Sequence, residues 1–178
     1  MSEKSRRSVL EGIPKNLSAL TKAQRLQDKA AGIGFDWKEL QPILNKMHEE
    51  IHELEDAIKC WDKAIKINPK DFKAYNHRGM LLIELKRIED AIKSWENAIK
   101  IKPDFAEAYN NRANVLRVLS QLESALDSCN TAIEIKPDFA EAYNNRGIVL
   151  VELKQLDAAL KSYENAIKIN PNENFLLG

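Results

Sequence analysis

The densest group of side chains capable of acid–base or metal chemistry lies between residues 48 and 53, which read His-Glu-Glu-Ile-His-Glu. On an α-helix, Glu49 and Glu53 are four residues apart and Glu50 and Glu53 are three apart, so the three carboxylates can converge. Carboxylate oxygens suit hard divalent cations such as Mg²⁺. The spacing therefore allows these three glutamates to meet on one face of a helix.

The same segment also fits the pattern His-Glu-x-x-His through His48, Glu49 and His52, in which two histidines on one helix can bind zinc. The pattern constrains only three residues in a stretch that is already rich in acids. No convincing third ligand follows, because Asp71 and His77 belong to a different part of the sequence. We therefore interpret His48 and His52 as exposed residues that flank a charged stripe.

A second set of polar side chains recurs at a fixed interval of 34 residues. One position of the repeat is always Asn, and the next is His or Asn; the members are Asn76, His77, Asn110, Asn111, Asn144 and Asn145. A side-chain amide carries both a donor and an acceptor, so it can bridge the N–H and C=O groups of an extended peptide. A row of such amides predicts binding to peptide backbone with little sequence preference. The alternative is a solvated face that repeats for structural reasons only.

An arginine follows each of these pairs, at Arg78, Arg112 and Arg146. We expect these arginines to form salt bridges with acids of an adjacent helix, such as Glu107 or Glu141.

The interval of 34 residues governs most of the chain. Four prolines mark it, at Pro69, Pro103, Pro137 and Pro171, and the residues between them nearly repeat themselves. Each unit predicts two amphipathic helices, because apolar residues recur at spacings of three and four. Small residues are expected where the paired helices approach closely, and Tyr or Trp beside them. Each proline ends a unit, and Asp71, Asp104 or Asp138 is placed to cap the next helix.

This pattern resembles the tetratricopeptide repeat over three full units, residues 72–171, preceded by one second-half helix at residues 54–69. The resemblance is carried by one residue set per unit: Tyr75, Gly79, Leu82, Ala91, Trp95, Ala98 and Pro103; Tyr109, Ala113, Leu116, Ala125, Cys129, Ala132 and Pro137; Tyr143, Gly147, Leu150, Ala159, Tyr163, Ala166 and Pro171. It implies a right-handed superhelical solenoid whose first-half helices line a concave, peptide-binding groove. In family members that bind a free carboxylate, basic residues stand where this chain has Glu141 and Asn145, so that mode of binding is not expected.

The N-terminal third resembles a different family. The sequences LSALTKAQRLQDKAAGIGFDW and LNKMHEEIHEL, within about residues 12–58, are similar to MazG-type nucleoside triphosphate pyrophosphohydrolases. The resemblance implies that Glu49, Glu50 and Glu53 correspond to that family's Glu-Glu-x-x-Glu metal motif. The second acidic motif of the family is missing, because residues 66–85 are already repeat sequence. The expected role of this segment is a helical hairpin that caps the first repeat and completes a fourth, degenerate unit, with residues 38–51 as the partner of residues 54–69.

Composition narrows the class of protein. The 178 residues carry 27 basic and 27 acidic side chains, which argues against a strongly basic nucleic-acid surface. No apolar run is long enough for a membrane span or a signal peptide, so we expect a cytoplasmic protein with no nucleic-acid or membrane partner. The two cysteines, Cys60 and Cys129, are expected to be buried small residues and not a disulfide.

The sequence therefore predicts an all-α chain divided into a tail (1–16), a MazG-like cap (17–53), a repeat array (54–171) and a C-terminal tail (172–178). The expected function is a non-catalytic scaffold, without a cofactor, that binds a peptide segment of a partner protein. The alternative is a Mg²⁺-dependent nucleotide pyrophosphohydrolase with an incomplete site. An apolar flank on the last helix also predicts a homodimer formed through the C-terminal end.

Overall fold

The computed structural model describes residues 37–171, with side chains described from residue 41 onward. This part of the chain forms seven α-helices and no strand, which confirms the all-α class. The predicted tails and the helix-prone segment at residues 17–31 lie outside the described residues. The helices are α2 (Trp37–Ile67), α3 (Phe72–Glu84), α4 (Ile88–Ile101), α5 (Ala106–Val118), α6 (Leu122–Ile135), α7 (Ala140–Glu152) and α8 (Leu156–Ile169).

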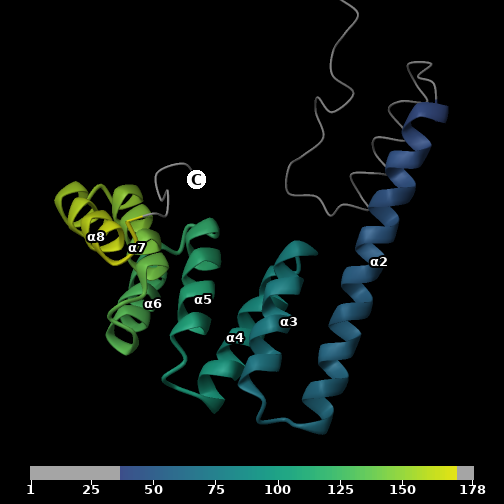
Figure 1. Cartoon of the computed structure of the whole chain (residues 1–178), viewed down its shortest axis with the longest axis horizontal. Helices are drawn as coiled ribbons and strands as arrows, with labels where there is room; N and C mark the ends of the chain where they lie inside the picture. The colour runs from purple at the N-terminus through teal and green to yellow at the C-terminus, as the bar shows by residue number, and fades with distance from the viewer. Residues whose placement is uncertain (1–36, 172–178) are drawn as a thin grey trace, which may run out of the picture.

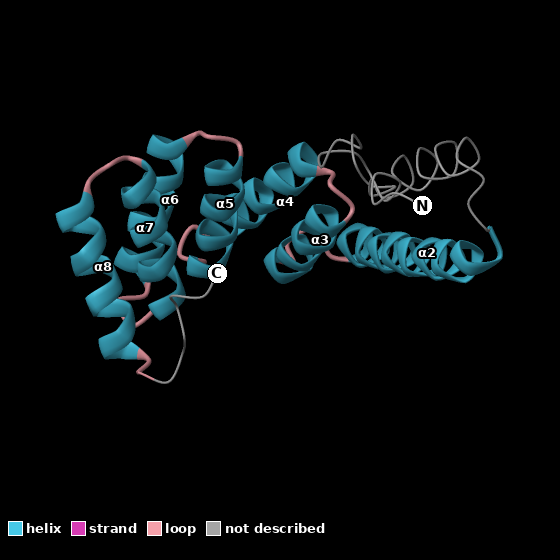
Figure 2. Ribbon diagram, turned by 90° about the horizontal axis from the view of Figure 1, so that it is seen from above, coloured by secondary structure: helices cyan, strands magenta, loops and turns pink. Residues whose placement is uncertain are grey.

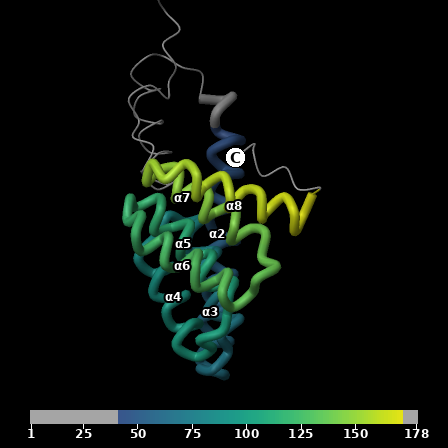
Figure 3. Tube along the Cα trace, turned by 90° about the vertical axis from the view of Figure 1, so that its left-hand side faces the viewer, coloured from purple at the N-terminus to yellow at the C-terminus, as the bar shows by residue number. Residues whose placement is uncertain are grey.

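The helices form a right-handed superhelical solenoid of helix pairs, as predicted (Figures 1 and 2). Within each unit the two helices pack against each other, as α3 with α4, α5 with α6, and α7 with α8. Each second helix also contacts the first helix of the next unit, so α2 packs on α3, α4 on α5, and α6 on α7. Seen from the end of the array, α7 and α8 stand in front of the earlier pairs (Figure 3).

The turn between paired helices has the same geometry in all three units. Lys86, Ser120 and Lys154 adopt φ values of 60°, 60° and 61°, the left-handed conformation that ends many helices. The next residue then donates its backbone N–H to a carbonyl five residues back, as Arg87 does to Leu82 at 2.8 Å. A sharp reversal therefore follows each first helix without a glycine at the position that requires positive φ.

Helix α2 runs without a break across the predicted boundary between residues 53 and 54. The prediction that residues 38–51 fold back as the partner of residues 54–69 is therefore wrong. The sequence between the two segments contains neither glycine nor proline, so nothing ends the helix there. Pro42 lies inside α2, at its sixth residue, so the helix continues past a position that lacks a backbone N–H.

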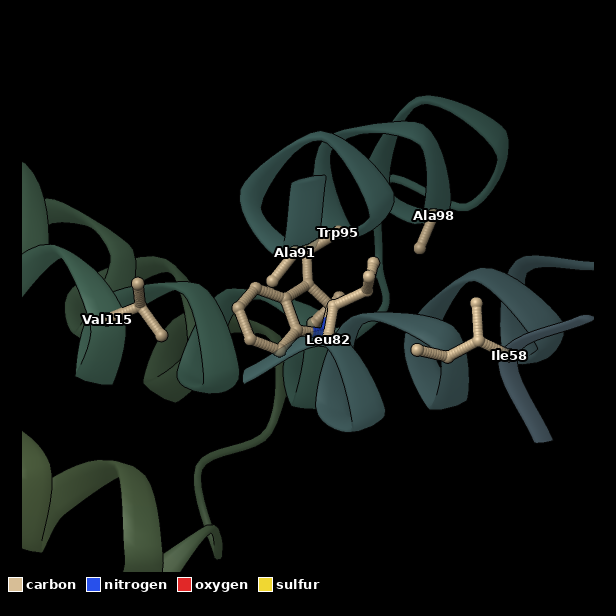
Figure 4. Packing of buried hydrophobic residues seen from close by; sticks show 7 residues of the cluster. Ile58, Leu82, Ala91, Trp95, Ala98 and Val115 are labelled. Carbon is tan, nitrogen blue, oxygen red and sulfur yellow. The ribbon is translucent and has the colours of Figure 1, made fainter. Parts of the chain in front are cut away.

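The core lies between paired helices and at the joints between units. Trp95, Leu82 and Ile58 are buried together, so that residues of α4, α3 and α2 meet in one cluster (Figure 4). The alanines predicted to allow close approach are buried in all three units, for example Ala91 and Ala98. Among the described side chains of α2, the one that belongs to this cluster is Ile58, in the second half of the helix.

Two predictions about polar residues need correction. Asp71 caps α3 as expected, because its carboxylate accepts hydrogen bonds from the backbone N–H groups of Lys73 and Ala74 at 3.0 and 3.1 Å. Asp104 and Asp138 do not cap, since Phe105 and Phe139 occupy the capping positions of α5 and α7. The reason is a difference of one residue: Lys70 separates Pro69 from Asp71, whereas the other two aspartates follow their prolines directly.

The two cysteines lie in different environments, and both are free thiols. Cys129 is buried as predicted, but Cys60 is exposed on α2, so the prediction for Cys60 is wrong. Burial raises the pKa of the Cys129 thiol to about 12, because the thiolate would lose its hydration.

Candidate peptide-binding face

The repeated asparagines meet across the joints between first-half helices. Asn111 of α5 donates its amide N–H to Asn76 Oδ1 of α3 at 3.0 Å, and Asn145 of α7 donates to Asn110 Oδ1 of α5 at 2.9 Å. Asn110 also donates to Glu141 Oε1 at 3.0 Å. These bonds join α3, α5 and α7 into one continuous surface, which we call the first-helix face.

The same bonds withdraw several of the amides from solvent. Asn110 is 1 % exposed, and Asn76 and Asn145 are also buried. Asn111 and Asn144 are half-buried, and His77 is exposed. A buried amide that loses its partner costs about 1–3 kcal/mol, so these side chains stabilise the joints between units whether or not they meet a ligand. Direct contact of the amides with a peptide stays a prediction.

The two ends of the row differ from its middle. At the first unit, His77 stacks on Trp61 of α2, with ring centroids 5.0 Å apart and planes inclined by 20°. At the last unit, Asn144 Oδ1 is buried and has no hydrogen-bond partner within the described part of the chain. Its counterparts, Asn76 Oδ1 and Asn110 Oδ1, both accept from the next unit. The row is therefore continuous across two joints and has an unused acceptor at its last position.

The first-helix face also carries exposed apolar side chains that were not predicted from the sequence. Met80, Val118 and Val151 are 47 %, 64 % and 43 % exposed. Met80 lies one helical turn after Asn76, and Val151 lies two turns after Asn144, so each apolar residue shares a face with an amide. A spacing of four or seven residues from an asparagine to an apolar residue on the same helix could have predicted them. This spacing is hard to see in the sequence because the equivalent positions of the other units carry different residue types.

The charged residues of this face are partly paired with one another. Arg117 of α5 and Glu152 of α7 form a salt bridge at 2.8 Å. Glu107 lies 3.8 Å from Lys136, and Glu141 accepts from Asn110 as described above. The surface offered to a partner thus combines exposed apolar side chains with polar groups held in place by their neighbours.

We predicted that the three repeated arginines pair with acids of an adjacent helix, and among the described residues this is confirmed for Arg78 alone, whereas Glu107 and Glu141 are not the partners. Each of the three arginines donates to a serine on the second helix of its own unit. The pairs are Arg78 with Ser94 at 2.7 Å, Arg112 with Ser128 at 3.0 Å and Arg146 with Ser162 at 3.0 Å. Only Arg78 also binds a carboxylate, that of Asp62 on α2, at 2.6 Å. The arginines point between the paired helices because their position lies next to the buried glycine or alanine of the unit.

The candidate metal ligands are all exposed on α2. Among the residues that the structure describes, no group of three or more His, Cys, Asp or Glu side chains is placed to hold a metal ion. Glu49, Glu50 and Glu53 therefore do not show the expected convergence, and this set does not fit a bound Mg²⁺. His48 and His52 are exposed as well; His48 Nδ1 lies 2.9 Å from the Leu44 carbonyl oxygen.

Stacked helix pairs joined by side-chain amides define the chain as a helical-repeat scaffold, a fold that supports interaction between proteins. Models of the tetratricopeptide repeat match residues 52–85, 79–117, 106–139 and 140–173, which together span residues 52–173. The chain belongs to the tetratricopeptide repeat family.

Solved structures with the same fold include MamA and the first tetratricopeptide domain of Spaghetti (RPAP3). The MamA crystal structure is 21 % identical and has a TM-score of 0.63, with 84 % of this chain and 87 % of that chain covered. The Spaghetti domain, solved with the HSP90 peptide SRMEEVD, is 23 % identical with a TM-score of 0.57, and 58 % of this chain and 82 % of that chain are covered.

A separate similarity covers less of the chain. The nucleoside triphosphate pyrophosphohydrolase of Escherichia coli (strain K12) is 43 % identical over 53 residues, 30 % of this chain and 20 % of that protein. The MazG pyrophosphohydrolase of Thermotoga maritima is 44 % identical over 39 residues, 22 % of this chain and 15 % of its own length. The chain thus spans about a fifth or less of these curated relatives.

None of the helices between residues 37 and 171 combines the length and the apolar character needed to cross a membrane.

Proposed function

We propose that this protein is a non-catalytic scaffold that binds a peptide segment of a partner protein on the first-helix face. The observation that carries the proposal is the exposure of Met80, Val118 and Val151 beside the joined amides. Exposed apolar side chains on one continuous surface are typical of sites that bind proteins. The Spaghetti domain, which has this fold, is solved in complex with an HSP90 peptide, and this supports peptide binding by the fold.

The apolar residues and the amides would have different roles in such a complex. Met80 is flexible and adapts to different side chains, while the valines offer fixed contacts. His77, Asn111 and Asn144 retain access to solvent and are the members of the repeated polar row able to bond a peptide backbone. Asn76, Asn110 and Asn145 would act by holding α3, α5 and α7 side by side.

The test compares two variants that replace exposed apolar residues by glutamate. Met80→Glu combined with Val118→Glu changes the first-helix face, whereas Ile67→Glu changes a residue that is 86 % exposed at the end of α2. Both variants should fold, since no replaced side chain is buried. Partner proteins captured from the source cell and quantified by mass spectrometry should be lost with the double variant and kept with Ile67→Glu. Equal capture by both would contradict the proposal.

The amide set needs its own variant. Asn111→Ala together with Asn145→Ala should weaken capture of the same partners and also lower the melting temperature, because both joints lose a hydrogen bond. Capture that is unchanged in a folded double variant would show that the amides serve the joints alone.

The same scaffold is proposed to form a homodimer through α8. Leu156, Leu160 and Ile167 are exposed along one side of this helix. The residues 34 positions earlier, Leu122 and Leu126, are half-buried against the neighbouring unit and pack into its core cluster. Leu156 and Ile167 lie at opposite ends of this stripe, so an antiparallel second copy would bring Leu156 against Ile167 of the first. Sedimentation should show a concentration-dependent dimer that Leu160→Glu abolishes; a strict monomer at high concentration would contradict it.

A second candidate function is favoured only by the similarity of the N-terminal segment to nucleoside triphosphate pyrophosphohydrolases. Pyrophosphate release from several nucleoside triphosphates with Mg²⁺ would test it, with Glu50→Gln as the control. Activity that the substitution removes would establish an enzyme, and absence of activity at any protein concentration would leave the scaffold.

A further inference from the structure

Each first helix packs against the second helices of its own unit and of the preceding unit, and it carries one of the repeated arginines; we call the residues around each arginine a crevice. Arg78 reaches from α3 to Asp62 on α2 and to Ser94 on α4. Arg146 occupies the equivalent place and reaches from α7 to Ser162 on α8 at 3.0 Å and to Asn130 on α6 at 3.4 Å. The first crevice therefore contains a carboxylate beside its arginine, whereas the third has an amide at the same position.

The charges of the three crevices differ at equivalent positions. The first crevice has two acids, Asp62 and Asp90, and two bases, Arg78 and Lys93. The second has two acids, Glu96 and Asp127, and one base, Arg112. The third has two bases, Arg146 and Lys161, and it has the uncharged residues Asn130 and Ala158 where the first has acids. The third crevice is thus the one that carries positive charge without a compensating acid at these positions.

A surface pocket of ≈ 290 Å³ opens at this third crevice. Arg146 and Lys161 are the charged residues of its lining, and Asn130 and Ser162 provide further polar groups. Its apolar walls come from Leu126 and Leu150, and Ala158 completes the lining. The Arg146 guanidinium is held in position by Ser162 and by the Tyr143 ring, whose centroid lies 5.1 Å from the guanidinium carbon.

We propose that this pocket binds the carboxylate of an aspartate or glutamate side chain from a partner protein. The chain itself shows the expected geometry, because Asp62 supplies such a carboxylate to Arg78 at 2.6 Å in the first crevice. A guanidinium binds a carboxylate through planar, charge-assisted hydrogen bonds, and Lys161 adds a second cation at the rim. The leucine walls fit an aliphatic side chain next to the acid in the same segment.

This site is separate from the first-helix face and does not depend on the function proposed there. The first-helix face consists of exposed residues of α3, α5 and α7, whereas the pocket is lined by residues of α6, α7 and α8. A partner segment could therefore dock here whether or not another segment occupies the amide-bearing surface.

The test uses the full chain and the side-chain NMR signal of Arg146 Nε–H. The probe is the blocked peptide acetyl-Leu-Asp-Leu-amide, compared with acetyl-Leu-Asn-Leu-amide, acetate and inorganic phosphate. We expect saturable shifts with the aspartate peptide and binding about tenfold weaker with the asparagine peptide, which corresponds to one lost charge–charge contact. Equal binding of both peptides would overturn the proposal, and equal or tighter binding of acetate or phosphate would assign a small-anion site instead.

The matched variant is Asn130→Asp, which places a carboxylate where the first crevice has Asp62. The new carboxylate should form a salt bridge with Arg146, abolish the response to the aspartate peptide and raise the melting temperature. Asn97→Asp adds the same charge at an exposed position of α4 outside the pocket and should leave peptide binding unchanged. Binding that survives Asn130→Asp, or is lost equally in Asn97→Asp, would contradict the assignment of the pocket.

Discussion

The middle unit fills the space between its paired helices differently from the units on either side. In the first unit Gly79 faces Trp95, and in the third Gly147 faces Tyr163; a Cβ atom on either glycine would lie 2.6 Å from the nearest ring atom. The middle unit has Ala113 and the buried Cys129 at the same two positions. Where the second helix carries a ring, the first has no side chain, and where the ring is replaced by a thiol, a methyl group is allowed.

This difference shows that the two positions act as one packing unit. Protein interiors are close to fully packed, so volume added on one helix must be removed from the other. Trp95 indicates that the volume of the ring matters more at this position than hydrogen bonding. Its indole N–H is buried and has no hydrogen-bond partner within residues 41–171. The three predictions below test this pairing.

The largest effect is expected for Trp95→Cys, which copies the second helix of the middle unit into the first unit. Gly79 cannot fill the space left by the ring, so the loss should be about 4 kcal/mol of unfolding free energy. Urea denaturation followed by circular dichroism measures it. Adding Gly79→Ala should recover part of the loss, since it restores the alanine–cysteine combination; no recovery would show that the two positions are independent.

The next effect is expected for Gly147→Val, which adds volume without removing the ring of Tyr163. Because the new side chain would overlap ring atoms, the helices must separate, and we expect a loss of about 3 kcal/mol. The middle unit provides the matched control, since Ala113→Gly should cost only about 1 kcal/mol through helix propensity. Similar losses for both variants, measured by urea denaturation, would contradict the proposed packing.

The smallest effect is the alkaline pH dependence that Cys129 contributes in the middle unit. Burial raises the pKa of Cys129 from 9.0, the value of a free thiol, to about 12, so the thiol stays neutral in the folded state while it ionises in the unfolded chain. The stability that depends on this group is complete below about pH 9 and falls as the pH rises from 9 toward 12, with a loss of about 1.4 kcal/mol at pH 10, the highest pH of the test.

The control for this prediction is Cys129→Ala, which should remove the alkaline slope. The difference between the two proteins isolates the thiol from tyrosine and lysine titrations that both share. Thermal unfolding at pH 8, 9 and 10 is sufficient, and parallel curves for both proteins would show that Cys129 ionises without unfolding. The exposed Cys60 is present in both proteins, so any contribution it makes to the pH dependence cancels in the difference.

The sequence was sufficient to predict the helix pairs, their period and the positions of the small residues. These follow from spacing, because apolar residues at three and four positions apart define a helix face wherever they occur. The continuous α2 was missed because the resemblance to a complete repeat favoured a break that no residue between 51 and 54 supports.

The polar contacts were harder to predict. Asn110 repeats as regularly as a binding residue would, yet the structure uses it to hold Asn145 and Glu141. A regular position shows that a side chain is needed in every unit, but it does not show whether its partner is a ligand or the neighbouring unit. Arg146 was predicted to pair with an acid, but its pocket could not be predicted, because it depends on Asn130, a residue that breaks the pattern of the other joints.

The amide bonds between units also affect how the array comes apart. Asn110 of the second unit bonds two side chains of the third, so detaching the third unit would break both hydrogen bonds at once. In a linear array, coupling between neighbours decides whether units melt singly or together. Each such bond makes it costlier for one unit to open while its neighbour remains folded. The amides should therefore suppress fraying and make the units unfold as a single cooperative block.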